Sequence, residues 1–233
     1  MPRPERSSEE IGAVREEIIG CAMDILVEEG YSNLSMAKIG ARMNMTAANV
    51  YNYFTNKEHI FLEIHDRAFQ FLYESLKSAV DPREDPRAKV RALIETYVEF
   101  GIRHSRHYEI MFCVRTPKYS DYEGTMLEKI VMDAKRVSLQ AFDLAVQTVE
   151  EALASLPGMR AEDARMLTVQ TWSMLHGLVS LYNNRTLVEA VENPEEIIAE
   201  ILGQALRPWG WDLEGEAAKM EISFAKEEEG HGI

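Results

Sequence analysis

Hydrophobic residues recur at three- and four-residue steps along most of the chain, which is the spacing that places side chains on one face of an α-helix. Gly and Pro separate the periodic segments at several points, as they do at helix ends. The pattern predicts an all-α protein. The expected helices cover residues 9–29, 36–43, 47–54, 59–80, 87–104, 108–114, 123–156, 161–185 and 194–206.

The second and third of these helices are short and stand close together. Ser35 and Thr46 precede them, and both are residue types whose side chains cap helix N-termini. Asn44 lies between them and tolerates the left-handed backbone of a sharp turn. The pair therefore predicts a helix-turn-helix, in which the second helix enters the major groove of DNA.

Charge supports this interpretation of the short pair. The chain has 39 acidic residues and a net charge of −14, yet no Asp or Glu occurs between Gly30 and Lys57. Lys38, Arg42 and Lys57 give this stretch a local charge of +3. Such a face can meet phosphate, while the acidic remainder discourages indiscriminate binding.

The side chains of the second short helix suit DNA by their chemistry. Thr46, Tyr51, Tyr53 and Lys57 are expected to reach phosphates, and amides such as Asn49 can pair with base edges. Short amphipathic helices are also common in all-α cores, so an alternative is that the pair only packs.

The order of residues resembles the N-terminal domain of the TetR family of transcriptional repressors, over residues 9–62. The resemblance rests on Gly30 with Tyr31, the run SMAKI at 35–39, Thr46, the run VYNYF at 50–54, and Asn56 with Lys57. The segment YNYFTNK at 51–57 is its most specific part. Asn44 replaces the Gly usual in the family's turn, and Ala37 stands where some members carry a base-reading Arg.

The resemblance implies a dimeric, all-helical regulator with a DNA-binding domain and a separate ligand-responsive C-terminal domain. We therefore divide the chain into a three-helix DNA-binding domain at 1–58 and a ligand-binding and dimerisation domain at 59–211. Residues 212–233 are rich in Glu and low in apolar content, and are expected to form an acidic tail. The resemblance also implies that the third helix reads a palindromic operator. The residues it places at DNA are Ser35, Lys38, Thr46, Ala47, Asn49, Tyr51, Asn52, Tyr53 and Lys57.

Two helices of the C-terminal part suggest a homodimer. The helix at 161–185 is apolar on two faces, and the helix at 194–206 carries a second apolar stripe. A helix that is apolar on two sides is buried twice, so a four-helix bundle between two copies is expected. The run from Trp172 to Gly177 also resembles a signature of one TetR subgroup. The alternative is that both helices belong to the core of a monomer.

Aromatic and Met residues of the C-terminal part are candidates for an effector site. They suit an apolar or amphipathic molecule whose binding would release a repressor from its operator. The same residues at helical spacing also suit a plain core. The candidates are Tyr97, Phe100, Met111, Phe112, Met132, Phe142, Trp172 and His176.

The sequence offers no catalytic, metal or cofactor motif. Cys21 and Cys113 are far apart without a CxxC spacing and are expected to be buried thiols. His104 and His107 are expected at a helix end or on the surface. With no apolar span or h-region, a cytoplasmic protein that is not an enzyme is expected. The alternative function is a helical-bundle small-molecule binder or enzyme without DNA binding.

Overall fold

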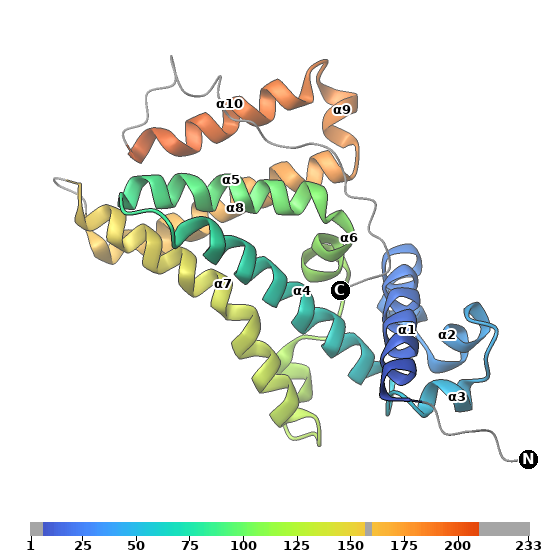
Figure 1. Cartoon of the computed structure of the whole chain (residues 1–233). Helices are drawn as coiled ribbons and strands as arrows, with labels where there is room; N and C mark the ends of the chain where they lie inside the picture. The colour runs from blue at the N-terminus through green and yellow to red at the C-terminus, as the bar shows by residue number, and fades with distance from the viewer. Residues whose placement is uncertain (1–6, 157–159, 210–233) are drawn as a thin grey trace, which may run out of the picture. The chain divides into compact units, whose positions relative to one another are not determined.

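The computed structural model describes residues 7–156 and 160–209 of the 233-residue chain. Every regular element in this part is helical, which confirms the all-α class (Figure 1). None of its helices is long and apolar enough to cross a membrane. The acidic tail expected over residues 212–233 lies outside the described residues.

The chain folds into two compact units, and neither is continuous in sequence. The first contains residues 7–69 and 106–137, and the second contains residues 70–105 and 138–209 among those described. The expected boundary between residues 58 and 59 falls inside a single helix, α4 (Lys57–Val80).

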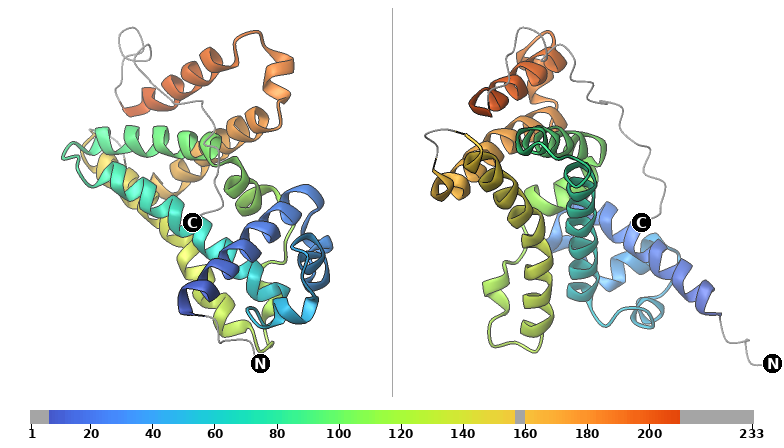
Figure 2. Two further views of the ribbon diagram at one scale, coloured as in Figure 1. Left: turned by 45° about the vertical axis from the view of Figure 1, so that its right-hand side comes forward. Right: turned by 60° about the vertical axis from the view of Figure 1, so that its left-hand side comes forward.

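The first unit holds the predicted helix-turn-helix. Its elements in chain order are α1 (Ser8–Glu29), a 3-10 turn (Tyr31–Asn33), α2 (Met36–Arg42), α3 (Ala47–Tyr51), the first part of α4, α6 (Ser105–Tyr108), a π-helical turn (Glu109–Cys113), a second 3-10 turn (Tyr119–Tyr122) and the first part of α7 (Glu128–Ala154). Figures 1 and 2 show α2 beside α3, and α2 also contacts α1.

One hydrophobic core joins these elements. Its fully buried members include Ile18, Ile25, Ile39 and Val50. Ile110 of the π-helical turn is part of the same core, although 46 residues separate it from Ile64. A segment that is distant in sequence therefore helps to hold the helix-turn-helix together.

The second unit is a layered helical bundle. Its elements are the second part of α4, α5 (Pro86–Arg103), the second part of α7, a 3-10 turn (Ala161–Asp163), α8 (Ala164–Asn183), α9 (Thr186–Ala190), α10 (Pro194–Leu206) and a 3-10 turn (Arg207–Trp209). α8 packs on α5, and α10 contacts both (Figure 1). Asp85 caps α5 through a 3.2 Å bond from the Arg87 amide, with Pro86 at the first helical position.

Several helix bounds differ from the sequence prediction, and the helix expected at 108–114 is instead α6 followed by the π-helical turn. At three bounds the local reason is visible. The predicted helix at 47–54 ends at Tyr51, and the following residues form a turn. The long helix begins at Glu128 rather than residue 123, after Gly124 in a positive-φ conformation. The helix at 161–185 ends at Asn183, and Arg185, with φ of 61°, starts the unpredicted α9.

Candidate nucleic-acid interface

The turn between α2 and α3 depends on two residues. Asn44 has φ of 54°, so it occupies the left-handed conformation that the sequence predicted. Gly40 lies against the turn, and the Met45 amide donates to its carbonyl at 2.8 Å. A Cβ at Gly40 would lie 2.7 Å from the Met45 carbonyl oxygen. The turn therefore needs glycine on α2, a requirement that sequence periodicity does not reveal.

Both predicted N-caps are present. The Ser35 hydroxyl accepts from the Lys38 amide at 3.2 Å, and the Thr46 hydroxyl accepts from the Asn49 amide at 3.3 Å. Each cap satisfies one amide that the helix itself leaves unpaired. Because the caps define where the helices begin, they also orient the first turn of α3.

The outward face of α3 is polar and uncharged. Thr46, Asn49 and Asn52 are exposed, and Tyr51 is 56% exposed. Ala47 is half-buried against the core. This face combines amide, hydroxyl and phenol groups without an acid, which is a chemistry suited to base edges and phosphates.

Tyr53 is less accessible than the sequence suggested. It is half-buried and packs against the hydrophobic core rather than being an exposed position of the helix. Its carbonyl accepts a hydrogen bond from Arg15 Nη1 at 2.5 Å. The end of α3 is thereby fastened to α1.

Arg15 makes three kinds of contact at this point. Besides the Tyr53 carbonyl, its Nη2 donates to Glu63 at 2.6 Å, and its guanidinium carbon lies 4.1 Å from the centre of the buried Phe54 ring. Glu63 also accepts from Arg67 at 2.6 Å. Arg15 thus connects α1, α4 and the end of α3.

Sequence reasoning missed Arg15 because its partners lie 38 and 48 residues away. Its helical position is next to the apolar stripe of α1, and that was the only available signal. The 2.7 Å ion pair between Arg67 and Glu16, which connects α4 to α1, was not predicted for the same reason, since 51 residues separate the two partners.

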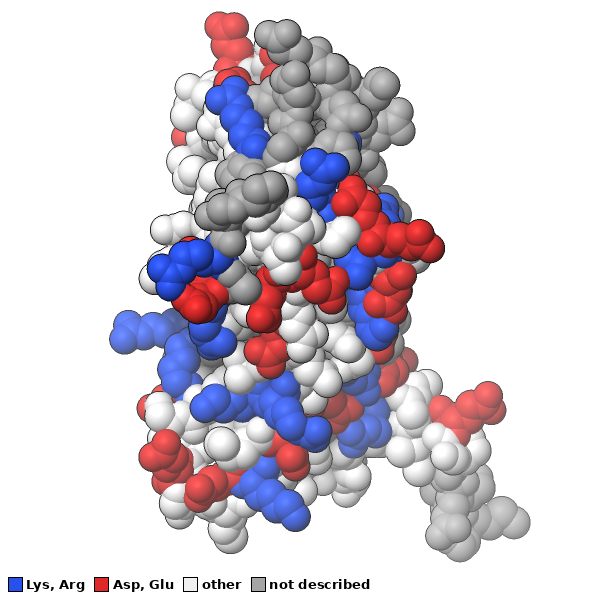
Figure 3. Space-filling view, turned by 90° about the vertical axis from the view of Figure 1, so that its left-hand side faces the viewer, with Lys and Arg blue, Asp and Glu red and all other residues white. Residues whose placement is uncertain are grey.

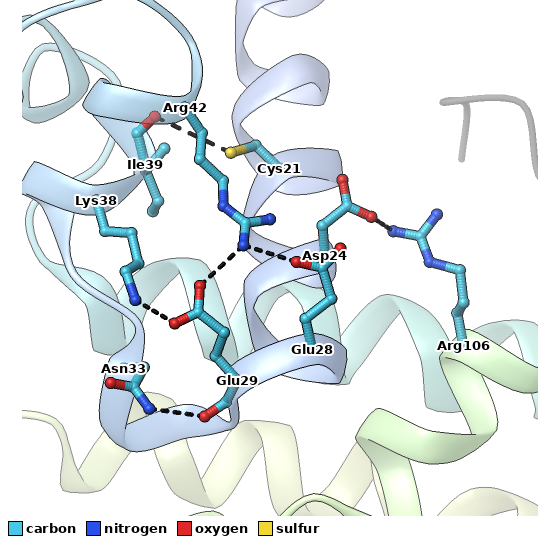
Figure 4. Close-up of polar contacts among 9 residues, drawn as sticks. All are labelled: Cys21, Asp24, Glu28, Glu29, Asn33, Lys38, Ile39, Arg42 and Arg106. Atoms are coloured by element: carbon cyan, nitrogen blue, oxygen red, sulfur yellow. Dashed lines mark hydrogen bonds and ion pairs between the residues drawn. The ribbon is translucent and has the colours of Figure 1, made fainter. Parts of the chain in front are cut away.

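The basic side chains of α2 are paired with acids of α1. Lys38 Nζ forms an ion pair with Glu29, and Arg42 Nη2 lies 2.6 Å from Glu28 and 2.8 Å from Glu29 (Figure 4). The expectation of three cations with no acid to oppose them is therefore wrong for Lys38 and Arg42. The acid-free stretch begins at Gly30, and the two acids that these cations contact, Glu28 and Glu29, stand immediately before it.

Lys57 is placed differently. Its Nζ lies 4.7 Å from the centre of the Tyr31 ring, at the first residue of α4. The ring face attracts the ammonium group and restricts where it points. Burial, more than any charge, raises the pKa of the Tyr31 phenol above its ordinary value.

His65 lies about two turns beyond Lys57 on α4, in an aromatic environment. Its ring centre is 5.5 Å from that of Phe61 and 4.7 Å from that of Phe69, and Tyr119 approaches at 6.2 Å. Its Nδ1 is buried without a hydrogen-bond partner among the described residues. Burial, reinforced by the Lys118 charge, lowers the pKa of His65 to about 4.

The candidate effector residues are divided between the two units. Met111, Phe112 and Met132 belong to the first unit, and Met132 is 51% exposed. The other five belong to the second unit, where Tyr97 and Phe100 are buried and Phe142 and His176 are half-buried.

Three of the effector candidates lie together within the second unit. Trp172 Nε1 donates to the Tyr97 hydroxyl at 2.9 Å, and the Trp172 ring centre is 6.1 Å from that of Phe142. Phe100 instead contacts Phe71 and His104, at 5.2 Å from each ring centre.

The remaining candidates for chemistry are placed as follows. His104 follows the last residue of α5, as predicted. His107 lies in the last turn of α6, which is also a helix end, but its side chain is buried. Cys21 is half-buried, but Cys113 on the π-helical turn is exposed, so the prediction of two buried thiols is wrong for Cys113. The described residues hold no group of three or more His, Cys, Asp or Glu that suits a metal ion.

Two capped short helices around a left-handed turn, with a polar second helix outward, define a helix-turn-helix DNA-binding protein. Comparison with known families places it further. The pattern of bacterial regulatory proteins of the tetR family matches residues 18–64, and that of the tetracyclin repressor-like C-terminal domain matches residues 90–205. The chain belongs to the TetR family of transcriptional regulators, which are DNA-binding proteins and not enzymes.

Individual relatives agree with this assignment. The HTH-type transcriptional activator FasR of Mycolicibacterium smegmatis is 24% identical over 169 residues, covering 72% of this chain and 68% of FasR. The uncharacterized HTH-type transcriptional regulator YobS of Bacillus subtilis is 24% identical over 198 residues, which cover 83% of this chain and 90% of YobS. The fatty acid degradation regulator FadR of Bacillus halodurans shares the fold, with a TM-score of 0.60 and 15% identity. The match covers 87% of this chain and 96% of the FadR chain.

Proposed function

We propose that the chain is a homodimeric repressor that acts in the cytoplasm, binds a near-palindromic operator, and is released by a small apolar or amphipathic effector. The observation that carries the DNA-binding part is the outward face of α3. Asn49, Tyr51 and Asn52 are all exposed there, while Val50 between them is fully buried. The helix is thus anchored by one side and presents amides and a phenol on the other.

The division of roles on α3 follows from chemistry. Asn49 and Asn52 carry amides, which can pair with the edge of adenine. Thr46, at the helix N-terminus, Tyr51 and Lys57 suit phosphate contacts, which set the register without reading sequence. Ser35 and Lys38 at the start of α2 and Ala47 and Tyr53 on either side of α3 complete the proposed interface.

The proposed dimer rests on the exposed side of α8. Met166, Val169, Met174 and Leu181 are between 38% and 62% exposed, although all are apolar. Their spacing places them on one side of the helix, and Gly177 in the middle of that side has open space beside its Cα. A self-complementary contact through this side of α8, extended by α10, would bury these residues across a two-fold axis.

The proposed effector site is the group formed by Tyr97, Phe142 and Trp172 in the second unit. It offers aromatic surface together with a hydroxyl and an indole N–H already bonded to each other. Such a group suits a ligand with an apolar body and one polar end, which could replace that bond. An effector that favours a dimer with its two α3 helices at the wrong separation would lower operator affinity by a coupling of about 1–3 kcal/mol.

The proposal is tested first with duplexes from upstream of the chain's own gene and its neighbours. We expect a gel shift at one near-palindromic site and a dimer mass in sedimentation. Tyr51→Ala and Lys57→Ala should weaken binding to all sequences, whereas Asn49→Ala should change base preference. Equal losses on specific and random DNA for all three variants would show that Asn49 reads no base.

The sign of regulation and the effector need their own measurements. FasR is called an activator, so a reporter gene under the operator must be compared with and without the protein, and lower expression with it is expected of a repressor. A screen of acyl and aromatic metabolites, read by operator release, tests the effector. A protein whose operator affinity ignores every ligand that binds the second unit contradicts this part of the proposal.

A further inference from the structure

The C-terminal end of α1 places two carboxylates against both basic side chains of α2. Glu29 contacts Lys38 and Arg42 at once, and Glu28 adds a second partner for Arg42 at 2.6 Å (Figure 4). The backbone at Glu29 is also held in place, since its carbonyl accepts a hydrogen bond from the side-chain amide (Nδ2) of Asn33 at 2.8 Å. Two positive and two negative charges therefore cancel within one cluster.

All four groups of this charge cluster, Glu28, Glu29, Lys38 and Arg42, are partly exposed. The side chains are between 31% and 58% exposed, so solvent ions and other anions can reach them. The hydrogen bond from Lys38, and then that from Arg42, lower the pKa of Glu29, while Glu28 and Glu29 raise the pKa of Arg42. The pairing therefore favours the charged forms of Glu29 and Arg42, and the exposure of all four side chains leaves the pairs open to exchange with other anions.

A DNA phosphate competes for the same cations. A phosphate, like a carboxylate, accepts hydrogen bonds from a guanidinium, and Arg42 Nη2 already donates to both Glu28 and Glu29. Mixed charge of this kind is also seen elsewhere on the surface, where Lys and Arg alternate with Asp and Glu on the face in Figure 3. Here, however, the paired cations stand on a helix of the DNA-binding motif.

The competition affects the two modes of DNA binding unequally. Nonspecific binding comes almost entirely from cations that neutralise phosphates, each adding about 0.9 to the slope of log affinity against log salt. Specific binding adds base contacts from α3, such as those proposed for Asn49. When internal carboxylates hold two of the cations, nonspecific binding therefore loses a larger share of its free energy than specific binding does.

We propose that Glu28 and Glu29 determine specificity by holding Lys38 and Arg42 away from phosphates, so that only a site read by α3 offsets the loss of the internal pairs. This inference rests on the operator binding proposed above. The acids act as internal competitors of the DNA backbone, and their removal should make the protein bind DNA more tightly but less selectively.

The test compares Glu29→Gln with Glu17→Gln in the full-length protein. Glu17 lies on the same helix, is exposed, and forms no ion pair among the described residues, so it matches the loss of one negative charge. Fluorescence anisotropy measures affinity for the operator and for a random duplex of equal length over a series of salt concentrations. We expect Glu29→Gln to raise random-DNA affinity about threefold to tenfold above Glu17→Gln and to steepen the salt slope by about 1–2. The ratio of operator to random affinity should fall.

A second background isolates the pairs themselves. In Lys38→Gln/Arg42→Gln protein, Glu29→Gln should have no larger effect than Glu17→Gln, because no cation remains to be freed. An equal rise for Glu29→Gln and Glu17→Gln in the wild-type background would overturn the inference, since net charge alone would explain it. A lower thermal midpoint with equal losses on both duplexes would also overturn it, because the pairs would then only hold α2 in place.

The two proposals fail in different ways. If wild-type protein binds operator and random DNA equally, the operator function fails. If the wild type discriminates and Glu29→Gln discriminates equally well, only the role of the acids fails.

Discussion

Two ion-pair networks lie along α1, and they differ in what surrounds them. The network near its N-terminal half joins Arg15, Glu63, Arg67 and Glu16, with side chains that are 20–35% exposed. It also includes a backbone carbonyl and the ring of buried Phe54. The charge cluster at the C-terminal end has side chains up to 58% exposed and contains only charged partners.

The difference separates two uses of charge in one domain. The Arg15 guanidinium also donates to a carbonyl and packs on a ring. Its removal leaves several groups without partners, so it should lower the free energy of unfolding substantially. Exposed pairs are screened by salt and contribute little to stability, but they decide how much charge is available to DNA. We therefore expect the first network to position α3 and the second to set electrostatics.

The largest effect is expected at Arg15. Arg15→Ala should lower the free energy of unfolding by about 2–3 kcal/mol and operator affinity by at least about tenfold, because the Tyr53 carbonyl and Glu63 lose a donor. Urea denaturation and anisotropy on operator DNA measure the two effects. Arg15→Lys keeps the charge but loses the planar guanidinium with its several donors. Its free energy of unfolding and operator affinity should lie between those of the wild type and Arg15→Ala. A change no larger than that of Arg42→Ala would remove the distinction between the networks.

The next effect concerns how α2 is held. Gly40→Ala places a Cβ 2.7 Å from the Met45 carbonyl oxygen and should destabilise the protein by about 2 kcal/mol. Gly12→Ala on α1 is the control, because its Cβ would meet nothing within 4 Å, and it should be neutral or stabilising. If Gly40→Ala is harmless while Lys38→Gln/Arg42→Gln unfolds the protein, then the pairs and not the packing hold α2.

The pH dependence of stability distinguishes buried from exposed groups. His65 has its pKa lowered to about 4 by burial, so the unfolded chain takes up a proton first as pH falls below the ordinary value of 6.5. Its contribution is complete above pH 6.5 and is lost as pH falls toward 4. We expect a loss of about 1–2 kcal/mol, less than the full shift because part of the ring is exposed.

Glu29 loses its contribution in a lower pH range. Its pKa is lowered from 4.5, so its stabilisation is present above that value and disappears only as pH falls below it. Denaturation curves between pH 7 and pH 5 should therefore respond to His65→Phe, which flattens the decline, and not to Glu29→Gln. A decline that persists unchanged in His65→Phe would exclude the histidine as its cause.

The smallest effect is expected within the charge cluster. Glu28→Gln should leave the thermal midpoint within about 2 °C of wild type, since its pair with Arg42 is exposed. Scanning calorimetry at low and high salt provides the measurement. A fall as large as that of Gly40→Ala would show that the cluster is structural.

The sequence predicted the local features of the DNA-binding motif well. The caps at Ser35 and Thr46 and the left-handed Asn44 depend on neighbours within a few residues, and all three are present. The candidate effector residues were harder to place, because Met and aromatic side chains at helical spacing look alike in a core and beside a ligand. The structure groups Tyr97, Phe142 and Trp172 but assigns Met132 to the other unit.

By itself, the sequence determined the all-α class, the helix-turn-helix and the family, because helical periodicity, caps and the run at 50–54 are local signals. Only the tertiary structure decided which charges are available. Lys38 and Arg42 meet Glu28 and Glu29 across two helices, and Arg15 meets Tyr53 from 38 residues away. Ion pairs between helices depend on how those helices pack, and packing is a property of the whole core rather than of any window along the chain.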